Sequence, residues 1–234
     1  MAKHKLARFA QMKTFGNVLE PAFEECFRTD YKLKGKWNEQ YFKNDHPIVL
    51  ELGCGKGEYT VGLGKKYPLK NFIGIDIKGA RMWRGAKQAL EGNLTNVAFL
   101  RTRIEFINSF FAENEVSEIW ITFPDPQLRK GRANKRLTSS RFLASYKQFL
   151  SDEGLIHLKT DNDFLYHYTL DVAQLNKLEV LVHTDDLYNS VFRETEESDI
   201  KTFYEQQFLE AGLSIKYLKF KLNRTMNFEE PSEK

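Results

Sequence analysis

The chain of 234 residues contains only two cysteines, Cys26 and Cys54, and they are not spaced as a CxxC pair. This excludes a disulfide framework and favours a reducing compartment. No apolar run approaches the ~18 residues that a membrane-spanning helix needs. The first eleven residues carry positive charge without an apolar stretch, so we expect no secretory signal and a cytoplasmic protein.

Metal-ligand spacing is absent from the sequence, and acidic charge is absent from two of its segments. The five histidines show neither metal-ligand nor catalytic-triad spacing, so we expect no bound metal. Residues 1–14 and 126–151 contain lysine and arginine but no aspartate or glutamate, and five of residues 129–136 are basic. This segregation favours a phosphate-bearing partner, although each run alone could be a solvated helix face.

The sequence does contain a regular alternation of short apolar runs and helical patterns. The runs that we predict to be strands are 46–52, 71–76, 96–100, 117–123, 154–160, 178–183 and 213–222. Alternation at 20–30 residue intervals predicts an α/β fold, a mostly parallel sheet of about seven strands with helices on both faces and an antiparallel last strand. We expect residues 1–45 to form an irregular, basic and aromatic extension and residues 46–234 a single domain.

A glycine-rich turn follows the first of these strands, in the segment Glu51-Leu-Gly53-Cys-Gly55-Lys-Gly57. Glycines let the backbone approach a ligand closely, and the next helix offers free N–H groups. The turn alone is weak evidence, because a strained loop needs glycine whatever it binds. The carboxylate of Glu51 would repel a pyrophosphate and attract an ammonium group, which favours an amino-acid-bearing cofactor over a dinucleotide.

Acidic residues also follow three later strands. Asp76 ends the second strand, where a carboxylate can accept both ribose hydroxyls, although it could instead cap the next helix. Asp125 lies between two prolines in Phe123-Pro-Asp-Pro, and prolines fix the backbone of a loop. Asp161 ends the strand at 154–160 and could likewise be a helix cap. Because strands of a parallel sheet present their carboxyl ends at one edge, these acids are candidates for a single site.

At these positions the sequence resembles the tRNA (guanine-N7-)-methyltransferases. The resembling residues run in the family's order from about Ile48 to Leu222: the glycine turn, Gly74-Ile-Asp76, Phe123-Pro-Asp-Pro with Asn134-Lys-Arg, Leu158-Lys-Thr-Asp161 and Thr202-Phe-Tyr-Glu205. The resemblance implies a Rossmann-like class I methyltransferase with S-adenosylmethionine as cofactor. It also implies tRNA as the partner and N7 of the variable-loop guanine, position 46 of tRNA, as the methylated atom.

The resemblance further implies which residues form the site. Those expected to bind the cofactor are Glu51, Gly53, Gly55, Gly57, Asp76, Ile77, Arg103, Ile104 and Asp125. Those expected to bind the substrate, mainly in elements 124–137 and 200–206, are Arg129, Lys135, Arg136, Asp161, Thr202, Phe203, Tyr204 and Glu205. Asp125 is the catalytic candidate. Guanine N7 has an in-plane lone pair, so we expect in-line attack without a general base.

The sequence departs from the family at three places. Gln127 and Leu128 stand where the family usually has tryptophan and a polar residue, and Leu137 stands where its basic cluster has a third lysine or arginine. Arg103 stands where the family usually has an acid. Because arginine cannot accept a hydrogen bond, the backbone of Arg103 or Ile104, or the side chain of Glu105, would have to contact the adenine.

Three alternatives stay open at this stage. The first is an NAD-dependent oxidoreductase, which the G-x-G-x-G spacing disfavours. The second is a methyltransferase acting on another base or on a protein side chain. The third is a catalytically idle tRNA-binding protein. The sequence also leaves open whether the protein is a monomer or a homodimer.

Overall fold

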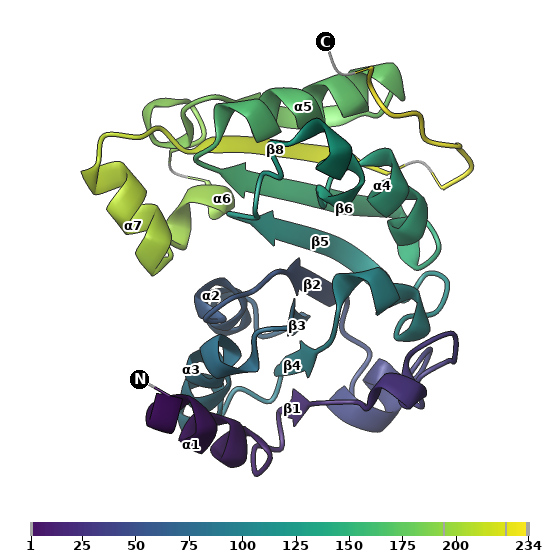
Figure 1. The fold of residues 1–234 in the computed structure, drawn as a ribbon, viewed down its shortest axis with the longest axis vertical. Helices are drawn as coiled ribbons and strands as arrows, with labels where there is room; N and C mark the ends of the chain where they lie inside the picture. Colours follow the sequence, from purple (N-terminus) through teal and green to yellow (C-terminus); the bar gives the residue numbers. More distant parts are fainter. Residues whose placement is uncertain (1, 194, 223, 233–234) are drawn as a thin grey trace. The chain divides into compact units, whose positions relative to one another are not determined.

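The computed structural model describes residues 2–193, 195–222 and 224–232. The chain forms two compact units, divided between Val116 and Ser117. In both units strands and helices alternate along the chain (Figure 1). The expected domain limits, 1–45 and 46–234, remain a prediction.

The first unit contains a parallel sheet in the order β1-β4-β3-β2. Its strands are β1 (Val18–Leu19), β2 (Ile48–Leu52), β3 (Asn71–Asp76) and β4 (Val97–Arg101), and its helices are α1 (Ala2–Met12), α2 (Glu58–Lys66) and α3 (Gly79–Glu91). Two 3-10 turns, η1 (Phe23–Glu25) and η3 (Ile104–Ser109), and a π-helical turn, η2 (Trp37–Phe42), complete it. All five residues of β2 are buried, which is typical of a parallel strand covered on both faces.

The expectation of an irregular N-terminal extension is wrong. Residues 2–12 form α1, which packs against α3, and β1 adds a short parallel strand beside β4. Trp37 is fully buried, and its indole N–H donates to the carbonyl of Phe110 at 2.8 Å. Tyr31 and Phe42 are buried as well, so part of this segment belongs to the core of the first unit, whereas Phe23 and Phe27 are exposed.

The second unit contains β5 (Val116–Thr122, which begins at the boundary), β6 (Leu150–Thr160), β7 (Val180–Thr184) and β8 (Lys216–Lys221), in the order β5-β6-β8-β7. Its helices are α4 (Ser140–Tyr146), α5 (Asp163–Leu175), α6 (Glu196–Asp199) and α7 (Phe203–Glu210), with 3-10 turns η4 (Lys130–Lys135) and η5 (Leu187–Asn189). In Figure 1, α5 runs along β8, against which it packs.

The predicted α/β class and the mostly parallel sheet are confirmed. The last strand, β8, is antiparallel to both β6 and β7, as expected. The described residues form eight strands rather than about seven, because the two-residue β1 lies in the segment expected to be irregular. The predicted helix after the third strand is instead the 3-10 turn η3, which begins with a β-branched residue, Ile104. No helix among the described residues is long and apolar enough to cross a membrane.

Candidate cofactor and substrate sites

The glycine loop after β2 owes its shape to three glycines in the left-handed region. The φ angles of Gly53, Gly55 and Gly57 are 77°, 54° and 70°, values that L-residues rarely adopt. The N–H of Gly53 donates to the carbonyl of Ile75 at 2.8 Å, which ties the loop to the end of β3. A Cβ on Gly57 would lie 2.5 Å from Cε1 of Phe99, so this position has no room for a side chain.

Glu51 is a buried carboxylate beneath this loop, with 3% of its surface exposed. One carboxylate oxygen accepts the backbone N–H of Thr60 at 2.8 Å and also the hydroxyl of Thr60. Since Thr60 lies in the first turn of α2, Glu51 stabilises the helix N-terminus, where negative charge is favourable. These hydrogen bonds therefore fix the position of the Glu51 carboxylate beside the glycine loop.

Asp76 lies at the end of β3 and joins the glycine loop to the segment that leads into α3. Its Oδ2 accepts the N–H of Gly55 at 2.9 Å, and its Oδ1 accepts the N–H of Lys78 at 2.7 Å. The residue at the N-cap of α3 is Lys78 and not Asp76. Each carboxylate oxygen has a second lone pair, so a partly exposed Asp76 can still accept hydroxyl donors from a ligand.

Two carboxylates add negative charge beside the centre of this loop. Burial raises the pKa of the Cys54 thiol well above its ordinary value, and the charges of Glu51 and Asp76 raise it further. Both carboxylates therefore act on the centre of the glycine loop. A field of this sign favours a cationic ligand group and opposes a phosphate.

The other expected cofactor residues of the first unit follow β3 and β4. Ile77 comes directly after Asp76 and is 49% exposed. Arg103 is exposed and precedes the 3-10 turn that Ile104 begins. In the sheet register Asp76 pairs with Arg101, two residues before Arg103, so these residues follow neighbouring strand ends.

In the second unit, the Phe-Pro-Asp-Pro loop is strained. Phe123 and Gln127, which flank it, both have a φ of 48° although neither is glycine. Such residues cost on the order of 1–3 kcal/mol each and concentrate at functional sites. The N–H of Phe123 donates to the carbonyl of Lys159 at 2.8 Å, and the N–H of Gln127 donates to Oδ1 of Asp125 at 3.0 Å. Asp125 itself is exposed, so its second oxygen faces solvent in this unit.

Arg136 is fully buried and holds the end of this loop. Its guanidinium donates to the carbonyl of Gln127 from Nε at 3.3 Å and from Nη2 at 3.2 Å. It also lies over the rings of Phe164 and Tyr168, at 4.7 and 4.4 Å from their centroids. The structure thus encloses the side chain that we expected to contact the substrate, whereas Arg129 and Lys135 are exposed.

Glu205 is buried at the start of α7, in a network that the sequence did not predict. Its Oε1 lies 2.7 Å from Nζ of Lys159, and both side chains have no exposed surface. The Tyr188 hydroxyl donates to the same oxygen at 2.7 Å. Glu205 and Thr202 also form a capping box, each accepting the backbone N–H of the other at 3.2 Å.

In the sequence, Lys159 is the residue that could have indicated this network. It lies within five consecutive buried residues of β6, and lysine is almost never fully buried without a partner. The sequence cannot identify that partner, because Glu205 and Tyr188 are 46 and 29 residues away.

The remaining substrate candidates are accessible. Phe203 and Tyr204, in the first turn of α7, are 45% and 41% exposed. Asp161 is partly exposed after β6, and α5 is capped by the side chain of Asn162 rather than by Asp161. Among the residues that the structure describes, no donor bonds to the Asp161 carboxylate, whereas its backbone carbonyl accepts from Nζ of Lys216 at 3.0 Å.

The structure thus brings Glu51, Asp76 and the three glycines together in the first unit. Within the second unit, the loop that carries Asp125 contacts β6 through Phe123 and Lys159, and Lys159 contacts Glu205. In the described part of the chain, no three His, Cys, Asp or Glu side chains form a group that could hold a metal ion.

Several known proteins that are similar to this chain share one name. A family described as "Putative methyltransferase" matches residues 45–218. A tRNA (guanine-N(7)-)-methyltransferase of Christiangramia forsetii is 56% identical over 94% of this chain and 99% of its own length. Proteins of the same name from Bacteroides fragilis and Porphyromonas gingivalis are 53% and 57% identical, covering 99% and 90% of this chain and 90% and 86% of their own lengths.

Solved structures support the fold. The chain is similar to an aminoglycoside resistance methyltransferase, with a TM-score of 0.54 and 16% identity over 82% of this chain and 95% of the other. It is also similar to a 16S rRNA adenine methyltransferase from Catenulisporales acidiphilia, solved with its cosubstrate SAM, with a TM-score of 0.53 and 13% identity over 86% and 93% of the two chains. At these identities the likeness concerns the fold alone.

Proposed function

Because the chain belongs to the tRNA (guanine-N7-)-methyltransferase family, we propose that it transfers a methyl group from S-adenosylmethionine to N7 of the variable-loop guanine of tRNA, position 46. The glycine loop of the first unit would hold the cofactor, and the exposed groups of the second unit would hold the guanine and its phosphates. We further propose that the reaction takes place in the cytoplasm.

The cofactor assignment rests on the hydrogen bonds that the carboxylate of Asp76 accepts. Both of its oxygens are positioned by backbone N–H groups, of Gly55 and Lys78, and each keeps a lone pair for a ribose hydroxyl. The negative field around Cys54 suits the ammonium and sulfonium charges of S-adenosylmethionine and would oppose the phosphates of a dinucleotide. The residues present therefore fit this cofactor.

When bound, S-adenosylmethionine supplies an electrophilic methyl group on a positively charged sulfur. Glu51 and Asp76 would orient it through its amino and ribose groups, while the glycines let the backbone approach it closely. The guanine N7 lone pair attacks in line, so positioning can supply on the order of 7–11 kcal/mol at best, and no general base is required.

In the second unit, Asp125 would stabilise the positive charge that the base gains on methylation. Its loop is strained at both flanks, and its carboxylate is exposed. Glu205 already accepts bonds from Lys159 and Tyr188. We therefore favour Asp161, to which no described donor bonds, as the acceptor for the N1 and N2 hydrogens of guanine.

The activity is tested by incubating the purified protein with radiolabelled S-adenosylmethionine and unmodified tRNA transcripts, followed by digestion and identification of the labelled nucleoside. We expect N7-methylguanosine, and none from a transcript whose variable-loop guanine is replaced. Label in another nucleoside would overturn the proposed base. Cofactor binding without any label would support an idle binder instead.

The role of Asp125 is tested with Asp125→Asn, which should lower kcat on the order of 100-fold, the cost of removing one stabilising group. Its melting temperature should stay close to that of the unchanged protein, and kcat is measured at saturating S-adenosylmethionine. Glu210→Gln, which removes an exposed charge from α7, is the matched control. An Asp125→Asn protein that folds, binds cofactor and methylates at the unchanged rate would refute the assignment.

A further inference from the structure

A pocket of about 330 Å³ lies in the second unit, and only Arg136 among its lining residues belongs to the proposed substrate site. One wall is α5, which contributes Phe164, His167, Tyr168 and Asp171. These positions are spaced i, i+3, i+4 and i+7, so they share one face of the helix. The volume is at the lower end of the range for ligand pockets, about 300–1,000 Å³.

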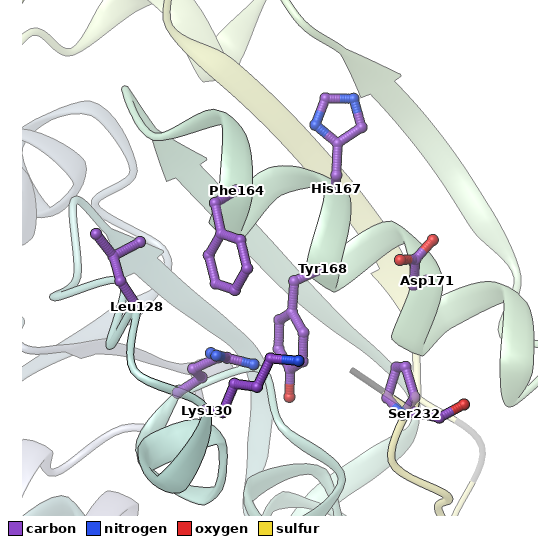
Figure 2. A pocket seen from close by; sticks show the side chains of 9 residues that line it. Leu128, Lys130, Phe164, His167, Tyr168, Asp171 and Ser232 are labelled. Atoms are coloured by element: carbon purple, nitrogen blue, oxygen red, sulfur yellow. The ribbon is translucent and has the colours of Figure 1, made fainter. Parts of the chain in front are cut away.

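The pocket combines an exposed aromatic ring with a positive rim. Phe164 is 42% exposed and Leu128, on the opposite side, is 61% exposed. Figure 2 shows Phe164 and Tyr168 pointing from α5 toward the side chain of Lys130. Asp171 is the one acid among the residues that line it in the described part of the chain. Flat apolar surface beside a cation is what a nucleotide requires, since its base stacks and its phosphate pairs.

The aromatic side chains that line the pocket are held by contacts with other residues of the second unit. The rings of Phe164 and Tyr168 are nearly parallel, with an interplanar angle of 14°, and Arg136 lies over both. The Tyr168 hydroxyl donates to Glu230, whose other oxygen accepts the N–H of Ser140 at 2.9 Å. The ring positions are therefore set before a ligand arrives, which lowers the entropic cost of binding.

The positive charge continues beyond the pocket. Lys130 is at its rim, and Arg129, Arg132 and Lys135 are exposed in the same segment, which contains no acid. A free mononucleotide would need one phosphate contact, whereas a row of cations matches a polynucleotide backbone. Arg136 connects the pocket to the loop of Asp125 through the carbonyl of Gln127.

We propose that this pocket holds an unpaired nucleotide of the tRNA, separate from the guanine that is methylated. Its base stacks on the exposed part of Phe164, and its phosphate pairs with Lys130. This inference rests on the proposed function, because it takes tRNA as the substrate. The bound nucleotide would anchor the tRNA while the target guanine leaves its own stack, a step that costs a few kcal/mol.

The pocket is tested by the variants Phe164→Leu and Phe164→Tyr. Leucine keeps apolar bulk but loses the flat ring, so KM for tRNA should rise on the order of 10-fold. The value of kcat at saturating tRNA and the affinity for S-adenosylmethionine should not change. Tyrosine should restore KM. Leu175→Ala, at the other end of α5 and 45% exposed, is the matched control. An unchanged KM in Phe164→Leu, with an unchanged melting temperature, would overturn the proposal.

A second measurement identifies the contact directly. A photoreactive benzophenone side chain at position 164 should crosslink to a tRNA nucleotide other than the target guanine. Crosslinking to the target guanine, or none with tRNA bound, would overturn the proposal. The proposal would also be overturned if adenosine monophosphate bound at the pocket without competing with tRNA. The unchanged protein is assayed first for N7-methylguanosine, so failure of the proposed function is seen separately from failure of this pocket.

Discussion

The glycine loop of the first unit and the Phe-Pro-Asp-Pro loop of the second reach the same unusual backbone region by different means. The first uses glycine at each left-handed position, Gly53, Gly55 and Gly57. The second has Phe123 and Gln127 at φ 48° and no glycine. Its shape is held by partners outside the loop, the carbonyl of Lys159 and the guanidinium of Arg136.

This difference predicts different weaknesses. A glycine loop has an intrinsic shape, so it should fail when a side chain is added within it. A loop of ordinary residues stays strained only while its surroundings enforce the strain. The second loop should therefore be sensitive to substitutions of the residues that pack around it.

The largest effect is expected from the buried pair beside the second loop. Lys159→Met leaves Glu205 buried without its cation, which should lower the free energy of unfolding by about 3–5 kcal/mol. The double variant with Glu205→Gln should recover more than half of that loss. Urea unfolding measures both. The control is Lys221→Met, which removes a partly exposed cation 2.7 Å from Glu153 and 3.4 Å from Glu179 and should cost no more than about 1 kcal/mol. Equal losses in Lys159→Met and Lys221→Met would contradict the comparison.

The next effect concerns the glycine loop. Gly57→Ala places a Cβ 2.5 Å from Phe99 at a φ of 70° and should cost about 2–4 kcal/mol through overpacking and strain. Gly212→Ala is the matched control, because Gly212 has a φ of 75° and nothing within 4 Å of the added atom. It should cost only about 1–2 kcal/mol. If thermal unfolding shows the same loss for both variants, crowding around the glycine loop is not what selects glycine there.

Substitutions of Arg136 should have a smaller effect on stability, and they distinguish a structural role of this residue from a contact with phosphate. Arg136→Lys loses the paired bonds to Gln127 and the planar contact with Phe164 and Tyr168, which should cost about 1–3 kcal/mol. Because the side chain of Arg136 is fully buried, we expect it to contact no phosphate, so Arg136→Gln should leave the salt dependence of tRNA affinity unchanged. Arg129→Gln should lower that slope by about one. A lower slope in Arg136→Gln would restore Arg136 as a phosphate contact.

The smallest expected effect is on the free energy of unfolding at alkaline pH. The folded protein holds the pKa of Cys54 above its ordinary value of 9.0, so the unfolded chain loses this proton first as the pH rises. The contribution is present below this ordinary pKa and is lost progressively as the pH rises above it. Urea unfolding at several pH values should show a flatter profile for Cys54→Ala. A variant that keeps the original slope would show that the thiol is not the group responsible.

The sequence predicted the features that depend on neighbouring residues. The glycine turn, the acids after the strands and the alternation of strands and helices are local patterns, so their elements could be read directly. The conformation of Gly57 follows from its residue type, and the place of Asp76 follows from the end of an apolar run.

Features that depend on distant partners could not be predicted. Arg129 and Arg136 look equivalent in the basic run, and only the fold places Phe164 and Tyr168 around one of them. Glu205 looks like an available acceptor until Lys159 is found beside it. The burial of Trp37 could not be predicted either, because the carbonyl that accepts its indole N–H belongs to Phe110, 73 residues away.

The contacts of Glu229 and Glu230 have a practical consequence for handling the protein. The side-chain amide of Asn176 accepts the backbone N–H of Glu229 at 2.7 Å and donates to the Glu229 carbonyl at 2.9 Å. The Glu230 carboxylate accepts from the N–H of Ser140 and the hydroxyl of Tyr168. These bonds hold Pro231 and Ser232 on the wall of the pocket beside Phe164. A chain shortened before Glu229 would therefore lose this wall of a pocket that is proposed to contact RNA. Assays of tRNA binding are better made with protein that retains residues 229–232.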